Sequence, residues 1–263
     1  MTIPYYEVLA FTDRLFAGNP AGICILEEWL PDSLLQKIAA ENNLAETAFF
    51  IDRGNVYDIR WLSPLAEIDL CGHATIGSAH VLFHHLGRSG NSLTFQSRIS
   101  GELKVERAGG RLVLDFPSRP APPCEAPLLL AESLGAEPKE VFQGRDYMAV
   151  FEREEQVAKL SPDLAKLTRL EGQGVVVTAP GNDCDFVSRY FAPKVGVPED
   201  PVTGSTHCVL VPYWSKRLGK NHLRARQLSP RGGELFCEDR GARVGIGGTA
   251  VTYAEGTLHL PDN

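Results

Sequence analysis

Cys71-Gly-His-Ala-Thr75 and Thr203-Gly-Ser-Thr-His207 are the two short stretches that decide the fold. Each opens an apolar run that closes at Leu-Gly, a common helix C-terminus. Gly72 and Gly204, the second residues of the two stretches, are 132 positions apart in the sequence. The pattern predicts two equivalent helices, one beginning at Gly72 and the other at Gly204.

The same offset recurs along the chain and indicates an internal repeat. It links eight further identical pairs: Leu86 with Leu218, Gly87 with Gly219, Gly101 with Gly233, Glu102 with Glu234, Leu103 with Leu235, Glu106 with Glu238, Gly109 with Gly241 and Arg111 with Arg243. Upstream of the glycines the offset becomes 129, as for Arg60 and Arg189. The second copy therefore carries three extra residues, in the stretch that contains Glu199 and Asp200.

A proline-rich stretch separates the two copies. Pro117-Ser-Arg-Pro-Ala-Pro-Pro123 cannot continue a helix or sit inside a sheet, so it predicts an extended linker. We expect an N-terminal half over residues 1–117 and a C-terminal half over 118–250. The final segment, 251–263, has no counterpart at the end of the first half, and we expect it to pack back onto that half.

Each half has the same order of elements. Alternating or β-rich runs come first, a loop and the apolar helix follow, and further β-rich runs close the half. Strands that flank one very apolar helix predict an α+β fold, in which each half is a rolled β-sheet around a central α-helix.

Composition excludes several classes of protein. The formal net charge is −7 and no basic block is present, which disfavours binding to nucleic acid or to an anionic membrane. No apolar stretch approaches the roughly 20 residues that span a bilayer, and no secretory signal is visible. The six cysteines form no CxxC pair, which is typical of reduced thiols. We therefore expect a cytoplasmic protein.

The two predicted helix entrances are candidates for anion binding. A helix N-terminus presents free N–H groups and a partial positive charge, and glycine lets an anion approach the backbone closely. Two entrances related by the repeat, at Gly72 and Gly204, are expected to converge on one site that holds a small carboxylate. Alternatively, both glycines only make turns.

Reactive side chains cluster around these entrances. Asp200 precedes Pro201 just ahead of Gly204, where it is either a catalytic carboxylate or an ordinary helix cap. We expect the positive helix end to keep the imidazole of His73 neutral and to lower the pKa of the Cys71 thiol. Cys71 is otherwise a small buried residue.

Glu46 is the candidate general acid–base. It stands directly before the apolar run Thr47-Ala-Phe-Phe-Ile51, where a carboxylate is partly desolvated and suited to exchanging protons. The repeat gives Glu46 no clear acidic twin, which favours one shuttling group over a symmetric pair of bases. The alternative is a solvated glutamate at a helix end.

The sequence favours neither a metal nor a nucleotide. His80, His84 and His85 have helical spacing, but no HExxH order or nearby cysteine accompanies them. Neither GxGxxG nor GxxxxGK[ST] occurs, and a GxSxG nucleophile elbow is also missing from the sequence.

Four motifs resemble the phenazine-biosynthesis PhzF family along essentially the whole chain. They are Phe16-Ala-Gly-Asn-Pro-Ala-Gly22, Asn43-Leu-Ala-Glu-Thr-Ala-Phe49, Leu70-Cys-Gly-His-Ala-Thr75 and Glu199-Asp-Pro-Val-Thr-Gly-Ser205. The resemblance implies the diaminopimelate-epimerase fold, with two similar halves and the site between them. It also implies a homodimer and no cofactor.

The resemblance assigns roles residue by residue. Glu46 falls on the family's catalytic glutamate, which shuttles a proton between carbons of the substrate, and His73 and Asp200 fall on its polar site residues. The backbone at Gly72–His73 and Gly204–Ser205 falls on its carboxylate cradle. Asn19 and Ser205 match positions that line the pocket.

One departure limits the chemistry. Related epimerases and racemases use a thiol at each helix entrance, but Thr203 stands where the second thiol would be. We therefore predict a cofactor-independent isomerase that moves a proton and a double bond on a small carboxylate-containing metabolite. Two alternatives stay open: a Cys71-dependent epimerase or racemase, and a catalytically silent protein that binds a small molecule.

Overall fold

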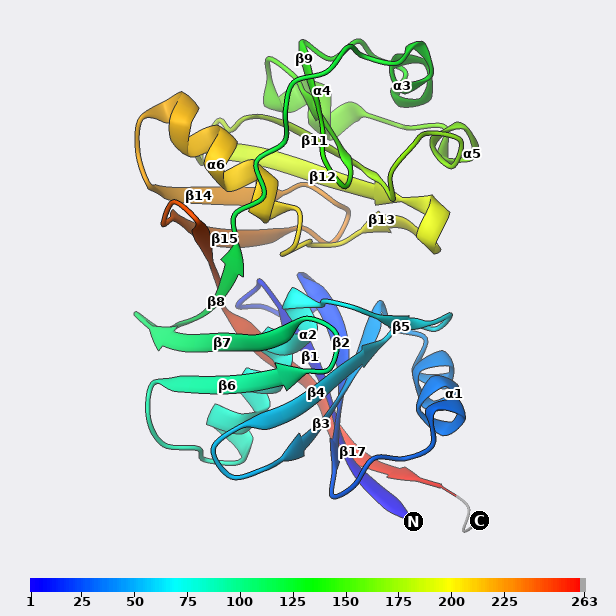
Figure 1. Ribbon diagram of the computed structural model, residues 1–263, viewed down its shortest axis with the longest axis vertical. Helices are drawn as coiled ribbons and strands as arrows, with labels where there is room; N and C mark the ends of the chain where they lie inside the picture. Colours follow the sequence, from blue (N-terminus) through cyan, green and yellow to red (C-terminus); the bar gives the residue numbers. More distant parts are fainter. Residues whose placement is uncertain (261–263) are drawn as a thin grey trace. The chain divides into compact units, whose positions relative to one another are not determined.

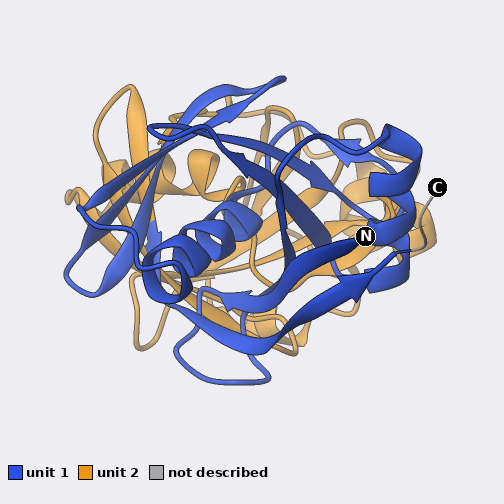
Figure 2. Ribbon diagram, turned by 90° about the horizontal axis from the view of Figure 1, so that it is seen from below, with its two compact units in different colours: residues 1–115, 247–263 blue, residues 116–246 orange. Residues whose placement is uncertain are grey.

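The computed structural model describes residues 1–260, and the chain divides into two compact units (Figure 1, Figure 2). Unit 1 joins Met1–Asp115 to the chain from Gly247 onward, and unit 2 is Phe116–Ile246. Of the segment 251–263 expected to return to the first half, residues 261–263 lie outside the described part. Within the described part, no helix has both the length and the apolar character that crossing a membrane requires.

Unit 1 is a curved sheet around one helix. Its strands are β1 (Thr2–Ala10), β2 (Asn19–Leu26), β3 (Glu46–Asp52), β4 (Tyr57–Leu62), β5 (Glu67–Ile68), β6 (Ser92–Ser97), β7 (Gly101–Ala108), most of β8 (Arg111–Pro117) and β17 (Ala250–His259). The helix α2 (Gly72–His80) contacts β1, β2, β3, β7 and β17, so strands lie on several sides of it (Figure 2). α1 (Asp32–Asn42) packs on the other face of the sheet through Leu35, Ile38 and Ala39.

Every residue of α2 is buried, as expected of a central helix. Its two hydroxyl side chains are satisfied within the helix: those of Thr75 and Ser78 donate to the carbonyl oxygens of Cys71 and Ala74 at 2.6 and 2.9 Å. Gly77 is needed for close packing, because a Cβ there would lie 3.0 Å from Cδ1 of Ile23. The helix continues as a π-turn, η1 (Val81–His85).

Unit 2 repeats this plan. Its strands are β9 (Glu140–Gln143), β10 (Tyr147–Val150), β11 (Val175–Pro180), β12 (Phe186–Ala192), β13 (Val197–Asp200), β14 (His222–Gln227), β15 (Gly233–Asp239) and most of β16 (Arg243–Gly248). Its helices are α3 (Leu128–Leu134), α4 (Glu154–Lys159), α5 (Leu164–Leu167), the 3-10 turn η2 (Pro193–Val195) and α6 (His207–Leu218). α6 packs against β14 and β15.

The strand pairings show that the halves are equivalent. Along β1-β2-β3-β4-β6-β7 the neighbours pair antiparallel, parallel, antiparallel, parallel and antiparallel. The series β9-β10-β11-β12-β14-β15 has the same order of directions. β5 and β13 are equivalent short strands, each antiparallel to the strand before it. The predicted α+β fold of two pseudo-symmetric halves is therefore confirmed.

The two predicted helix starts have different outcomes. α2 begins at Gly72 as predicted, but α6 begins at His207 and the predicted start at Gly204 is wrong. The carbonyl oxygen of Thr203 accepts hydrogen bonds from the side chains of Thr206 and His207, at 3.0 and 2.8 Å. The backbone N–H of His207 donates instead to the Gly204 carbonyl at 3.0 Å, so a tighter turn precedes the helix.

The proline-rich segment is bound to unit 2. Pro212 lies inside α6 and has no N–H to donate to the carbonyl of Cys208, and the backbone N–H of Arg119 donates to that oxygen instead, at 2.9 Å. Further along, Cys124 N–H donates to the carbonyl of Val141 at 3.0 Å. The segment therefore runs along α6 and the edge of β9.

Candidate active site

Glu46 and His73 form the centre of the candidate site in unit 1. Glu46 is the first residue of β3, and His73 is the second residue of α2. Nε2 of His73 lies 3.1 Å from Oε2 of Glu46, and the two side chains are 6% and 14% exposed. The strand start and the helix start thus bring together two residues that are far apart in sequence.

Asn19 and Cys71 complete this cluster. Nδ2 of Asn19 lies 3.2 Å from Nδ1 of His73, and Sγ of Cys71 lies 3.5 Å from the same nitrogen. Asn19 is the first residue of β2, and Cys71 precedes α2. An Nδ2 donor leaves Nδ1 of His73 as the acceptor, whereas a protonated Nδ1 would require Asn19 to present its oxygen. When Glu46 is ionised, Nε2 carries the proton that His73 donates to it, and an imidazolium also carries a proton on Nδ1, which requires Asn19 to present its oxygen.

The charge state of His73 is opposite to the sequence expectation. Burial lowers the pKa of His73, but the adjacent Glu46 carboxylate and the hydrogen bonds of the ring to Cys71 and Glu46 raise it, and the net pKa lies well above the ordinary value. The expectation of a neutral imidazole was therefore wrong. The effect of the positive helix end on the pKa of His73 is smaller than the effect of the groups in direct contact with its ring.

The expectation that the helix end lowers the pKa of the Cys71 thiol was also wrong, and the alternative of a small buried residue agrees with the burial of Cys71. Burial raises the pKa of Cys71 to about 11, although His73 acts to lower it. The thiol form therefore predominates at neutral pH, and the thiol form is a poor nucleophile and a poor base.

The donor atoms of this cluster do not make a metal site as they stand. Glu46, Cys71 and His73 offer one donor atom each, all within 4.8 Å of one another. However, Sγ of Cys71 lies closer to Nδ1 of His73 than to Nε2, at 3.5 against 3.9 Å, while Glu46 faces Nε2. A metal in line with Nε2 would not reach the sulfur, so the three atoms do not converge on one point.

His80, His84 and His85 of unit 1 are arranged differently from the cluster of Glu46, Cys71 and His73. Nε2 of His80 and Nε2 of His85 lie 3.0 and 2.7 Å from the hydroxyl of Thr252 on β17. Burial, followed by the neighbouring His84 and His85, lowers the pKa of His80 to about 4. The cluster therefore ties β17 to the end of the central helix.

In unit 2, Asp200 is fixed beside the turn that leads into α6. Its Oδ2 accepts from the hydroxyl of Thr203 at 2.5 Å. The buried amide of Gln227 holds both residues: Nε2 donates to the Asp200 carbonyl at 2.8 Å, and Oε1 accepts from the Thr203 N–H at 2.9 Å. Sequence reasoning missed Gln227, which lies on β14 and has no local signal.

Ser205 lies beside a second group that the sequence did not reveal. Nη2 of Arg145 is 3.5 Å from Oγ of Ser205, and the Arg145 side chain is 34% exposed. Asp146 holds the guanidinium at 3.0 Å and also accepts from the N–H of Gly174 at 3.1 Å. Burial, followed by Asp146, raises the pKa of the neighbouring Tyr190. The Gly204–Ser205 turn therefore has a cationic side chain next to it.

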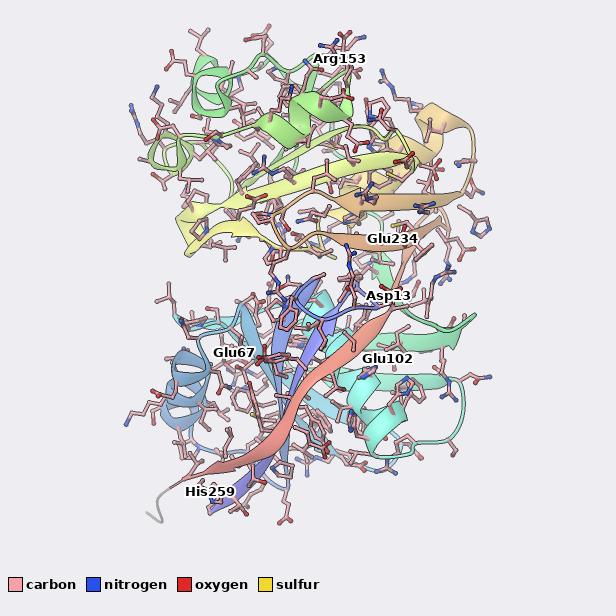
Figure 3. The ribbon with its side chains drawn as sticks, turned by 180° about the vertical axis from the view of Figure 1, so that it is seen from behind. Asp13, Glu67, Glu102, Arg153, Glu234 and His259 are labelled. Atoms are coloured by element: carbon pink, nitrogen blue, oxygen red, sulfur yellow. The ribbon has the colours of Figure 1, made fainter. Side chains whose placement is uncertain are left out.

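Each unit also has an arginine–glutamate clamp ahead of its helix. In unit 1, Arg60 donates to the two oxygens of Glu67 on β5 at 2.9 and 2.6 Å. Figure 3 labels Glu67. In unit 2, Arg189 donates to the two oxygens of Glu199 on β13 at 2.7 and 2.9 Å. Hydrogen bonding to Arg60 is the main cause that lowers the pKa of Glu67. Bidentate pairs of this kind fix the strands that lead to the two entrances.

The predicted site residues thus fall into two groups. Asn19, Glu46, Cys71, Gly72 and His73 lie together in unit 1. Asp200, Gly204 and Ser205 lie together in unit 2. That both groups serve one reaction remains a prediction from the repeat.

Comparison with known proteins agrees with these features. The sequence pattern of the phenazine biosynthesis-like PhzC/PhzF family matches residues 8–256. An uncharacterized isomerase of Pseudomonas aeruginosa is 50% identical over 99% of this chain and 100% of its own. A PhzF-family crystal structure from Enterococcus faecalis has a TM-score of 0.96 at 47% identity, covering 99% of this chain and 100% of that one.

The fold is shared more widely. A hydroxyproline epimerase from Agrobacterium vitis has a TM-score of 0.63 at 10% identity, covering 99% of this chain and 93% of that one. This likeness concerns the fold alone.

The chain therefore belongs to the PhzC/PhzF family, and its fold is the diaminopimelate-epimerase-like fold of two similar halves. It is an isomerase of this family.

Proposed function

We propose that the protein is a cofactor-independent isomerase in which Glu46 moves a proton between two carbons of a small carboxylate-containing metabolite. The observation that carries the proposal is the contact of 3.1 Å between Glu46 and His73 at the start of α2. A largely buried carboxylate, held by one hydrogen bond and adjacent to a helix N-terminus, is suited to general acid–base catalysis.

The proposed reaction needs no redox partner. The Glu46 carboxylate takes a proton from an activated C–H, and the electron pair of that bond delocalises toward the substrate carboxylate. The protonated Glu46 then returns the proton to a different carbon, so the double bond moves and the atoms balance.

His73 acts on Glu46 and on the developing charge. Its Nε2 proton orients the carboxylate, and its positive charge favours the anionic intermediate. Asn19 holds the other ring nitrogen, at 3.2 Å. We infer that both residues keep Glu46 in one position during the reaction.

We propose that the residues of unit 2 hold the substrate carboxylate. Gly204 and Ser205 form a tight turn, and the Arg145 guanidinium lies 3.5 Å from the Ser205 hydroxyl. Asp200 is fixed by Thr203 and serves as the polar partner of the substrate.

The two alternative functions are less well supported. A Cys71-dependent racemase needs a thiolate, but burial raises the pKa of that thiol to about 11. The place of a second thiol is taken by Thr203, whose hydroxyl is bound to Asp200. A silent binding protein would not need a carboxylate paired with a buried histidine. The homodimer and the cytoplasmic location are further predictions from the sequence.

The test is incorporation of solvent deuterium into small unsaturated carboxylates, followed by NMR. Exchange catalysed by the wild type is expected to fall by roughly 10²–10⁴-fold in Glu46→Gln. Glu41→Gln is the matched control, because Glu41 is an exposed carboxylate on α1.

Equal exchange in wild type and Glu46→Gln would refute the proposed role of Glu46. Loss of exchange in Cys71→Ala, with Glu46→Gln fully active, would support the racemase instead. Carboxylate binding without exchange in any of these proteins would favour the silent binding protein.

A further inference from the structure

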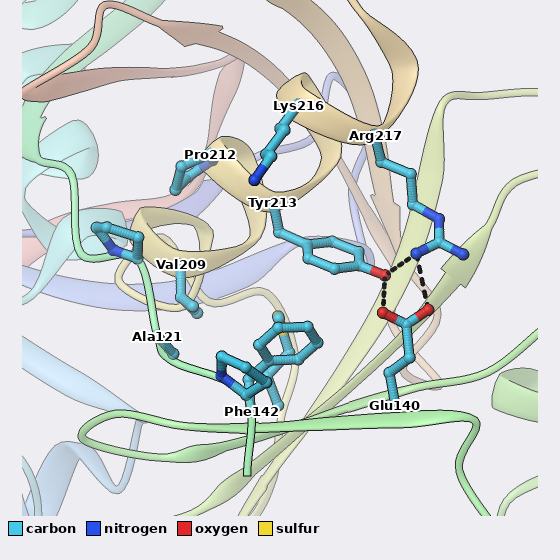
Figure 4. A pocket seen from close by; sticks show the side chains of 11 residues that line it. Ala121, Glu140, Phe142, Val209, Pro212, Tyr213, Lys216 and Arg217 are labelled. Carbon is cyan, nitrogen blue, oxygen red and sulfur yellow. Dashed lines mark hydrogen bonds and ion pairs between the residues drawn. The ribbon is translucent and has the colours of Figure 1, made fainter.

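The helix α6 has a second partly apolar face that its own sheet does not cover. Leu210, Val211 and Trp214 are buried on the side of β14 and β15. A stripe spaced at i, i+3, i+4 and i+7 lies elsewhere on the helix surface: Val209, Pro212, Tyr213 and Lys216. These residues line a cavity of about 480 Å³ (Figure 4).

The other walls of this cavity come from the proline-rich segment and from β9 and β10. Ala121, Pro123, Phe142 and Met148 are apolar residues of these walls. The segment is fixed in place, since Gln143 N–H donates to the carbonyl of Pro122 at 3.1 Å. The rings of Phe142 and Tyr213 meet edge to face at 5.2 Å. The walls are therefore preformed.

One end of the cavity is polar. Glu140 accepts from Nη1 of Arg217 at 2.7 Å, and the same nitrogen lies 2.7 Å from the Tyr213 hydroxyl (Figure 4). The charge of Glu140 is thus already balanced by Arg217. In the described part of the chain, the ammonium group of Lys216 has no carboxylate within ion-pair distance. The lining therefore carries one positive charge in excess.

We propose that this cavity binds a small aromatic carboxylate. Its volume lies in the range of small-molecule sites, and its lining combines apolar walls with a few polar groups at one end. The aromatic body packs against Phe142, Met148 and Val209, and the carboxylate pairs with Lys216. All the lining residues belong to unit 2, and none is among the residues proposed for proton transfer.

The experiment uses naphthalene-2-carboxylate as the probe and 2-naphthamide as its uncharged analogue. Titration calorimetry is expected to show saturable binding of the carboxylate, weaker by at least about tenfold for the amide and for Lys216→Gln. Lys159→Gln is the control, an exposed lysine of unit 2 on α4, and it should bind as the wild type does. Intermolecular NOEs to the methyl groups of Val209 and Ala121 are expected to locate the probe.

Two further variants separate this site from the catalytic proposal. Val209→Trp fills the cavity and is expected to abolish binding, while its melting temperature reports whether the variant is folded. Glu46→Gln is expected to bind the probe normally, whatever its effect on exchange. Equal binding of acid and amide, equal binding by Lys216→Gln, or unchanged binding by folded Val209→Trp would each overturn the proposal. Exclusion of the probe by a dimer that covers Val209 would overturn it as well.

Discussion

The helices α2 and α6 occupy equivalent places in the two units, yet they are enclosed differently. In unit 1, β1 and β2 press directly onto α2, which requires Gly77 at the contact with Ile23. The repeat places Val209 at the position of Gly77, and in unit 2 this residue faces a cavity.

The strands explain this difference. β1 is covered at its outer edge by β17, in an antiparallel pairing that extends from Thr2 to Ala10. Within the described residues, the outer edge of the equivalent strand in unit 2, β9, carries the isolated bridge between Pro123 and Phe142 and a few backbone hydrogen bonds in place of a paired strand. The same plan therefore occurs once as a closed half that contains the buried Glu46–His73 pair and once as a more open half that contains the polar groups proposed to hold the substrate.

The largest expected effect is a loss of stability at acidic pH, caused by His207 at the start of α6 in unit 2. Burial lowers the pKa of His207 to about 4, with the Thr203 carbonyl acting in the other direction. Because the unfolded chain binds the proton more readily, the free energy of unfolding should fall as pH drops from about 6.5 to 4. The expected loss is about 3 kcal/mol.

The measurement is urea unfolding at several pH values for wild type and His207→Asn. Asparagine retains a donor for the Thr203 carbonyl but does not titrate, so the variant should show a shallower dependence on pH. An unchanged dependence of the unfolding free energy on pH would show that the titration of His207 does not cause the loss of stability in acid.

The next prediction tests directly whether α2 and α6 are packed differently. Gly77→Leu should destabilise the protein by about 1–3 kcal/mol, because the new side chain must displace Ile23 and Val8. Val209→Leu, the equivalent substitution in unit 2, should change stability by less than about 0.5 kcal/mol, since it extends into the cavity. Urea unfolding of both variants compares them, and equal losses would contradict the difference in enclosure.

The smallest expected effect tests the proposal that unit 2 holds the substrate carboxylate. Arg145→Gln should weaken binding of malonate by about threefold to tenfold, because a partly exposed guanidinium is lost beside Ser205. Arg169→Gln is the control, an exposed arginine of the same unit. Calorimetric titrations that give one affinity for all three proteins would show that Arg145 does not contribute to carboxylate binding.

The sequence predicted the repeat, the α+β halves and the start of α2 at Gly72, because these depend on local and periodic signals. It failed at Gly204, where side chains of Thr206 and His207 take the Thr203 carbonyl. It failed for the charge of His73 as well, because contacts made only in the fold outweigh the helix end.

Other site residues carry no local signal at all. Gln227 and Arg145 act through contacts with residues 24 and 60 positions away, at Thr203 and Ser205. The approach of Glu46 to His73 likewise depends on how β3 is placed beside α2. Such pairings follow from the register of the sheet, which the sequence pattern alone did not specify.

The most direct test of the proposed division of roles is a pH titration of the two buried histidines at the helix entrances, followed by ¹⁵N NMR. His73 is expected to remain an imidazolium at neutral pH, and Glu46→Gln should lower its pKa. Its stabilising contribution would be present below pH 6.5 and lost as pH rises through its own pKa. His207 is expected to stay neutral until the pH approaches 4. A His73 that loses its proton below pH 6.5, or that titrates together with His207, would contradict the claim that unit 1 carries the acid–base chemistry.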